Sequence, residues 1–536
     1  MENPKAKKIA RLEESDLHVP GAFADVLFSR GVHTLAISKK LHAENREKYV
    51  NKMRVALAVD EVAPIVVFKG GVSRCRNDSD FEELFRQESY FQYLFGVKEP
   101  DWYGSIDIQS GEARLFAPRL PSEFAIWMGK IASAESLSAK YGVPVIWIDA
   151  MDNFLNSFTT QAKISLQGTN SDSDQSIENA LTWDRPHVQT VLSSLAFNNL
   201  AECRVIKSSA EIEVVRYACY SASRAHVAVM KSAKPGDYEY QLEARFLAAC
   251  YEKQGCRNVA YTSICACGPN GAILHYGHAG EPNAGRLEED HMALLDMGCE
   301  YHCYCSDITC SFPARGEFSS DQRIIYQAVL NAQRAVIAAA KPGVSWVAMH
   351  ELAEKTILCA LQQAGILIPD LPITKFLDAD IGALFMPHGL GHFIGLDTHD
   401  VGGYLPGHPQ RSKRPGKSKL RTSRILQPGM LLTIEPGCYF IDALLDPALQ
   451  NPETARFFVP HVLSRFRGFG GVRLEDVVLI TNAGLSNLTL CPRTIDEVEG
   501  VMSGSLEWPP PTDTAPELQR AWGSFKNGAF HHEPLL

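Results

Sequence analysis

The chain has 536 residues, an apolar fraction of 45% and a formal net charge of −10 at pH 7. These values are typical of a globular protein with two ordinary domains, each with its own core. They exclude a basic surface for nucleic acid, and no apolar run is long enough to predict a membrane span. The N-terminus lacks the apolar core of a secretory signal and the 14 cysteines are scattered, so we expect free thiols and a cytoplasmic protein.

The first part of the chain, residues 1–200, alternates short apolar stretches with helical ones and predicts a mixed α/β domain. The predicted elements are buried strands at 64–69 and 143–148, a hairpin formed by 103–108 and 113–117, and a helix at 123–140. This part contains no catalytic signature that we recognise.

From residue 203 the sequence contains the same pattern twice, a long helix, a Lys-Pro-Gly terminator and a second helix. The predicted helices are 211–233 and 240–253 in the first unit, and in the second a helix that starts at a capping box of Ser319 and Gln322, followed by 348–363. Each unit precedes strand-like segments. This duplication predicts two similar halves facing each other across a shared sheet. Residues 501–536 are rich in proline and glycine and predict a mobile tail.

Two aspartates interrupt the apolar stretch at residues 293–311. Asp296 is expected near the end of one strand and Asp307 inside the next, with a turn at Gly298 between them. Aspartate is depleted in strands and is rarely buried without a partner, so the pair requires a compensating charge. A bound cation is the simplest candidate.

Three later segments add further ligand-type side chains. They contain His388, His392 and His399, then Glu435 directly before a Pro-Gly turn, then Arg473 and Glu475 on a predicted strand. Carboxylates with one imidazole suit manganese, cobalt or zinc better than thiophilic metals. Four carboxylates and one histidine carry more charge than one divalent ion needs, so they fit two ions ~3.5–4 Å apart with a bridging hydroxide as nucleophile.

The ordered set Asp, Asp, His, Glu, Glu, together with surrounding strings, resembles the pita-bread dinuclear metallopeptidases. Within that family the strings are most similar to the prolidases, or Xaa-Pro dipeptidases; they include YTSIC, ILHYGHAGEPN, SDITCSFPA, MPHGLGHFIG, HDVGGY and RFRGFGGVRLED. The resemblance runs over residues 85–476. It implies an α/β (α+β) protein with a pita-bread catalytic domain over residues 203–500, built from two pseudo-twofold halves.

The resemblance also implies which residues act. The metal ligands would be Asp296, Asp307, His392, Glu435 and Glu475, holding two divalent ions for which manganese is favoured, with cobalt and zinc left open. His388 would contact the scissile carbonyl. Our candidate for proton transfer is Glu435. Arg473 lies two residues from Glu475, so on a regular strand it would share that face and buffer the carboxylates. The free proline carboxylate would be bound by Arg421 with His275 and His399, beside Tyr261. The substrates would be Xaa-Pro dipeptides and the enzyme a homodimer.

Other interpretations stay open at this point. Aminopeptidase P uses the same chemistry to remove the residue before proline from longer peptides. A non-catalytic pita-bread module, or a metal-free enzyme resembling creatine amidinohydrolase, would lack the ligand set, and none of the five ligands is missing here. By a period of two, Cys299, Cys303 and Cys305 are expected to share a face with Asp307, either as packing or as an oxidation-sensitive thiol.

Overall fold

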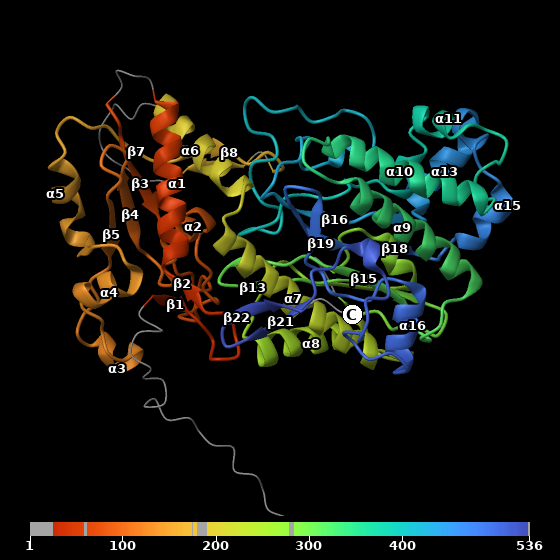
Figure 1. The fold of residues 1–536 in the computed structure, drawn as a ribbon, viewed down its shortest axis with the longest axis horizontal. Helices are drawn as coiled ribbons and strands as arrows, with labels where there is room; N and C mark the ends of the chain where they lie inside the picture. The colour runs from red at the N-terminus through yellow and green to blue at the C-terminus, as the bar shows by residue number, and fades with distance from the viewer. Residues whose placement is uncertain (1–24, 58–61, 174, 179–189, 278–282, 534–536) are drawn as a thin grey trace, which may run out of the picture.

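The computed structural model describes residues 25–57, 62–173, 175–178, 190–277 and 283–533. A smaller N-terminal part and a larger C-terminal part lie side by side (Figure 1). One continuous cluster of buried apolar side chains extends through both, from Leu27 and Tyr93 to Val477. The N-terminus, for which no secretory signal is predicted, lies outside the described residues. Among the helices that the structure describes, none has the length and apolarity needed to span a bilayer.

The N-terminal part is built on a five-stranded sheet of order β6-β5-β4-β3-β7. Its strands are β3 (Ile65–Lys69), β4 (Tyr103–Asp107), β5 (Ala113–Ala117), β6 (Val145–Trp147) and β7 (Lys163–Ile164). The predicted strands and the β4–β5 hairpin are therefore confirmed. The two long helices of the N-terminal part are α1 (Lys40–Ala56) and α6 (Thr190–Val205). Its shorter elements include α2 (Ser89–Phe95), β1 (Val26–Phe28), β2 (Ile37–Ser38), α5 (Met151–Asn156), β8 (Gln167–Thr169) and β9 (Ser176–Glu178).

The single helix expected at 123–140 is wrong. The structure has two helices there, α3 (Phe124–Met128) and α4 (Ala134–Tyr141). Gly129 separates them at φ +77°, a left-handed conformation that ends α3 and that glycine adopts at little cost.

The C-terminal part contains the predicted duplication. The first half has α7 (Ser209–Ser232), α8 (Glu239–Ala248) and an antiparallel sheet of β11 (Ile264–Cys267), β12 (Met292–Asp296) and β15 (Thr309–Pro313). The second has α9 (Ser320–Ala339), α10 (Trp346–Gln363) and an antiparallel sheet of β16 (Leu431–Ile434), β19 (Asp476–Ile480) and β20 (Leu485–Asn487). The Ser319–Gln322 capping box is confirmed. A further ribbon of β17 (Gly437–Tyr439) and β18 (Gly471–Arg473) packs against β12 and β15 and so joins the halves.

Shorter elements complete the C-terminal part. They are β10 (Asn258–Val259), β13 (Cys299–Tyr301), β14 (Tyr304–Cys305), α11 (Ile373–Asp378), α12 (Gly382–Phe385), α13 (Asp442–Gln450), α14 (Pro452–Ala455), α15 (Pro460–Leu463) and α16 (Ile495–Ser503).

Two predicted ligands do not lie inside strands as expected. Asp307 follows β14, which pairs with β13, and precedes β15, which belongs to a different sheet. Glu475 likewise lies between β18 and β19, which belong to two sheets. Its backbone N–H donates to the Thr309 carbonyl of the other half at 3.1 Å instead of continuing a ladder. Both carboxylates therefore lie where the chain passes from one sheet to another. The apolar sequence pattern runs on through these points, although the strand ends there.

The expected mobile tail is also wrong for its described residues. After α16 the chain forms a hairpin of β21 (Gly523–Lys526) and β22 (Ala529–His532). Phe525 packs edge-on against Tyr217 of α7, and the Ala36 N–H of the N-terminal part donates to the Gly528 carbonyl at 3.1 Å. Arg520 is buried and paired with Glu497 at 2.8 Å. The segment therefore contacts both parts of the molecule, and only residues 534–536 of the predicted tail lie outside the described residues.

Candidate metal centre and substrate cavity

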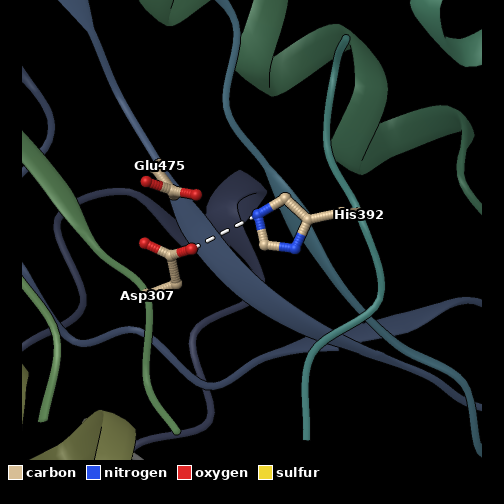
Figure 2. Close-up of side chains that lie close together, drawn as sticks. All are labelled: Asp307, His392 and Glu475. Atoms are coloured by element: carbon tan, nitrogen blue, oxygen red, sulfur yellow. Dashed lines mark ion pairs between the residues drawn. The ribbon is translucent and has the colours of Figure 1, made fainter. Parts of the chain in front are cut away.

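Three ligand-type side chains converge in the centre of the C-terminal part. Figure 2 shows Asp307, His392 and Glu475 pointing toward one another from three separate segments. One ligand atom from each lies within 4.8 Å of the others, and all three residues are buried. His392 Nε2 lies 3.3 Å from Asp307 Oδ2. The spacing suits a cation held between the three side chains.

The backbone around His392 fixes its ring. Its N–H donates to Thr433 Oγ1 at 3.1 Å, and its carbonyl accepts from the Thr433 N–H at 2.9 Å. The preceding Gly391 packs so closely that a Cβ would meet the Thr433 carbonyl at 2.0 Å. His392 Nδ1 lies 2.9 Å from the Phe393 carbonyl, to which it donates, so Nε2 is the ring atom that faces the carboxylates and that would bind a cation.

The remaining two predicted ligands adjoin this group. Glu435 Oε1 lies 3.4 Å from His392 Nε2. Asp296, at the end of β12, accepts hydrogen bonds from the Tyr261 hydroxyl at 2.6 Å and from Arg473 Nη2 at 2.7 Å. The structure thus brings three of the predicted ligands into one close group, sets Glu435 beside His392, and holds Asp296 between Tyr261 and Arg473.

The buried carboxylates of the site carry more negative charge than the neighbouring positive groups compensate. Burial raises the pKa of Glu475 well above its ordinary value, and the neighbouring Asp307 and Glu435 charges raise it further. Burial likewise raises the pKa of Glu435 to about 7 and raises that of Asp296. Among the described residues, Arg473 is the one arginine that donates a hydrogen bond to a side-chain carboxylate of this group, Asp296. Hard oxygen donors with one imidazole and excess negative charge fit divalent cations, so the residues present match the expected metals.

A second set of contacts leads to His388 from the metal-ligand group, the five predicted ligands Asp296, Asp307, His392, Glu435 and Glu475. Arg473 Nη1 donates to the Tyr439 oxygen at 2.9 Å, and the Tyr439 hydroxyl lies 2.9 Å from His388 Nε2. His388 Nδ1 donates to the Gly389 carbonyl at 2.8 Å, so its Nε2 accepts from Tyr439. Burial lowers the pKa of His388 to about 4, which keeps the ring neutral. His388 Nδ1 lies 3.9 Å from Glu435 Oε2.

All the predicted site residues line one cavity of about 850 Å³. They are Tyr261, His275, Asp296, Asp307, His388, His392, His399, Arg421, Glu435, Arg473 and Glu475. The His399 ring lies 4.5 Å from the His392 ring, between centroids. Arg421 pairs with a carboxylate of the N-terminal part, Asp172, at 3.0 Å.

Sequence reasoning missed three contributors to the site. Thr309 Oγ1 donates to Glu475 Oε2 at 2.7 Å and accepts from Arg473 Nε at 3.1 Å. Tyr439 links Arg473 to His388. Asp172 lies in a polar loop far along the chain from Arg421. Only Tyr439 had a signal, since it follows Glu435 by four residues on a short strand; a threonine in a strand and an aspartate in a polar loop have none.

The predicted common face of three cysteines is wrong. Cys303 lies in the turn between β13 and β14 at φ +67°, and Cys305 pairs with Glu300, so it points away from the Cys299 side. None of the three lines the site cavity. Cys299 instead lines a separate, mostly apolar cavity of about 690 Å³ together with Cys250 and Cys256. All 14 cysteines are free thiols, as predicted.

Comparisons with known proteins agree with this architecture. Residues 213–482 match the family described as Metallopeptidase family M24, and residues 42–166 match Aminopeptidase P, N-terminal domain. A protein named Xaa-Pro dipeptidase from Homo sapiens is 47% identical over 478 residues, which are 89% of this chain and 96% of that protein. A probable Xaa-Pro aminopeptidase from Phaeosphaeria nodorum is 36% identical over 82% of this chain and 95% of its own length.

Solved structures have the same fold. The structure of Pseudomonas aeruginosa aminopeptidase PepP aligns with a TM-score of 0.70 and 29% identity, covering 88% of this chain and 99% of that one. The chain therefore combines an N-terminal domain of the aminopeptidase P type with a pita-bread catalytic domain. The mixed α/β class and the pita-bread domain are as expected. This chain belongs to metallopeptidase family M24.

Proposed function

We propose that this protein is a metal-dependent dipeptidase that hydrolyses Xaa-Pro dipeptides with a free C-terminal proline. One observation carries the proposal: a single cavity is lined both by the buried carboxylate–imidazole group of Asp307, His392 and Glu475 and by Arg421. The first group suits hydrolysis and the second suits a terminal carboxylate. The relatives that are named Xaa-Pro dipeptidase support the same activity.

Two divalent ions per subunit would be held by Asp296, Asp307, His392, Glu435 and Glu475. When bound, such ions acidify a water and polarise the scissile carbonyl. We propose manganese, as the resemblance to prolidases favours it, while the same donors also suit cobalt and zinc.

The chain's own residues would supply the proton transfers. Glu435, beside His392 and His388, would take a proton from the attacking water and pass it to the leaving nitrogen. Proton delivery matters because a prolyl amide releases a secondary amine. The neutral His388, held by Tyr439 and the Gly389 carbonyl, would contact the substrate carbonyl. Arg473 would keep Asp296 ionised and oriented.

Arg421 would bind the proline carboxylate, because its planar fork pairs bidentately with carboxylates. His275 and His399, which line the same cavity, would assist, and Tyr261 would form part of the wall while its hydroxyl holds Asp296. We further propose that the enzyme is a homodimer in the cytoplasm.

Aminopeptidase P activity is the second candidate, since relatives named Xaa-Pro aminopeptidase cover most of the chain. Purified full-length protein, treated with chelator and reloaded with manganese, cobalt or zinc, should be assayed with Gly-Pro, Gly-Pro-amide and Gly-Pro-Ala. Hydrolysis of Gly-Pro that requires metal and fails with the amide supports a dipeptidase. Preference for Gly-Pro-Ala would favour aminopeptidase P, and full activity after metal removal would reject both.

A further inference from the structure

We propose that Asp172 of the N-terminal domain is a specificity-determining residue that restricts substrates to two residues. Its carboxylate lines the substrate cavity next to Arg421 and repels a peptide whose chain, and terminal carboxylate, continue past proline. The inference deepens the proposed dipeptidase activity and rests on it.

Asp172 joins two arginines of the catalytic domain. Its Oδ2 lies 3.0 Å from Arg421 Nη1, and its Oδ1 accepts from Arg411 Nη2 at 2.6 Å. About a quarter of the Asp172 side chain is exposed, and it lines the same cavity as the metal-ligand group. Within the described residues, Asp172 is the only carboxylate paired with Arg421. One domain thus places a negative charge in the substrate cavity of the other.

The contacts on either side hold Asp172 in place. Asn170 Oδ1 accepts from the backbone N–H groups of Asp172 and Ser173, each at 2.9 Å, which closes a local turn. Arg411 Nη1 donates to the Leu420 carbonyl at 2.6 Å, and its guanidinium stacks over the Tyr404 ring at 4.3 Å. Because Arg411 is fixed by these contacts, the Asp172 carboxylate has a defined position beside Arg421.

Asp172 and the reacting group face the same cavity. Asp172, Arg421 and the five predicted metal ligands all line it. Asp172 Oδ2 contacts Arg421 directly, and Arg421 is the proposed partner of the proline carboxylate. The Asp172 carboxylate therefore adjoins the position at which a bound dipeptide would end.

The proximity of Asp172 to Arg421 is how substrate length would be sensed. A dipeptide ends at proline, and its carboxylate can use the N–H donors that Arg421 does not give to Asp172, since a guanidinium has five. A tripeptide carries its carboxylate one residue farther, which in this proposal brings it beside Asp172. Two carboxylates there repel each other in a partly buried setting where water screens them weakly.

The test compares substrates that differ in terminal charge. Asp172→Asn keeps the shape of the side chain and removes its charge, and kcat/KM is measured for Gly-Pro, Gly-Pro-Ala and Gly-Pro-Ala-amide. We expect the ratio of kcat/KM for Gly-Pro-Ala to kcat/KM for Gly-Pro to rise at least tenfold, mainly through a lower KM for Gly-Pro-Ala. The ratio for the uncharged Gly-Pro-Ala-amide should move less than threefold, because it has no carboxylate to repel. Asp172→Glu, which keeps the charge, should retain the wild-type ratios.

Asp149→Asn is the matched control. Asp149 pairs with Arg119 on the surface of the same domain at 2.9 Å and does not line the cavity. This substitution therefore also removes one negative charge from the domain, but at a position outside the substrate cavity. Equal ratios in Asp172→Asn, Asp149→Asn and wild type would overturn the inference while leaving the dipeptidase intact. A wild-type enzyme that does not hydrolyse Gly-Pro in any metal-loaded form would instead reject the proposed function.

Discussion

Arg473 of the second half donates to Asp296 of the first half, with 2.7 Å between Nη2 and Oδ2. The backbone supports the pair, because the Ser311 hydroxyl donates to the Arg473 carbonyl at 2.9 Å. The site is therefore assembled across the boundary between the two repeated units. The predicted ligands come from both halves, so the site exists only where the two halves meet.

Replacing Arg473 by methionine should destabilise the metal-free protein. The substitution leaves Asp296 without its guanidinium in a buried setting, and breaking such a pair costs about 3–5 kcal/mol. Thermal melting of chelated and metal-loaded protein measures this, and the loss should be smaller with metal, which compensates the carboxylates. Arg119→Met is the control, since exposed pairs contribute about 0–1 kcal/mol. An equal loss in both variants would contradict the argument.

Glu435→Gln should abolish turnover while the protein still binds metal. An amide is nearly the same size as the carboxylate, but it cannot take a proton from water. Asp307, His392 and Glu475 remain to hold the ions. Initial rates with Gly-Pro and elemental analysis of the same sample test this together. Retained activity at intact metal content would remove Glu435 from proton transfer.

The chemistry of this site could be predicted from sequence better than its geometry. Each predicted residue lines the cavity, because ligand types in a fixed order carry a strong signal. Strand positions for Asp307 and Glu475 were wrong, since an apolar pattern does not reveal where a chain passes from one sheet to another. Asp172 could not be found, because its partner is distant in sequence and polar loops usually face solvent.

The C-terminal segment, residues 504–533, shows the same limit in the fold. Its proline- and glycine-rich composition predicts a mobile tail, since composition counts apolar residues without their partners. The few apolar side chains it has, Phe525 and Leu518 among them, find contacts on α7 and in the core. The first predicted helix of each repeat, α7 and α9, is by contrast correct, because each begins at a capping box and has a clear helical period.

Gly391→Ala should weaken metal binding without touching a ligand. A Cβ at this position would meet the Thr433 carbonyl at 2.0 Å, so the backbone must move and carry His392 with it. We expect a metal affinity at least tenfold lower, measured by competition with a chelator. Gly484→Ala is the control, because a Cβ there meets nothing within 4 Å. Unchanged affinity in Gly391→Ala would show that the loop absorbs the shift.

Arg520→Gln should destabilise the protein at neutral pH and less so in acid. Burial raises the pKa of Glu497, but hydrogen bonds from Arg520 outweigh it, so this pKa lies below its ordinary value of 4.5. A carboxyl with a depressed folded pKa stabilises the fold above its unfolded pKa, and this stabilisation is lost as pH falls through the folded value. We therefore expect the free energy of unfolding of the variant to be about 1.5–3 kcal/mol lower than that of wild type at neutral pH, as for loss of a hydrogen bond to a charged group. This difference should become smaller below pH 4.5. Melting temperatures of wild type and variant across this range measure the difference, with Arg334→Gln, whose partner Glu517 is half exposed, as control. A gap that stays constant or widens in acid would mean that the Arg520–Glu497 pair does not fix the C-terminal segment through its charge.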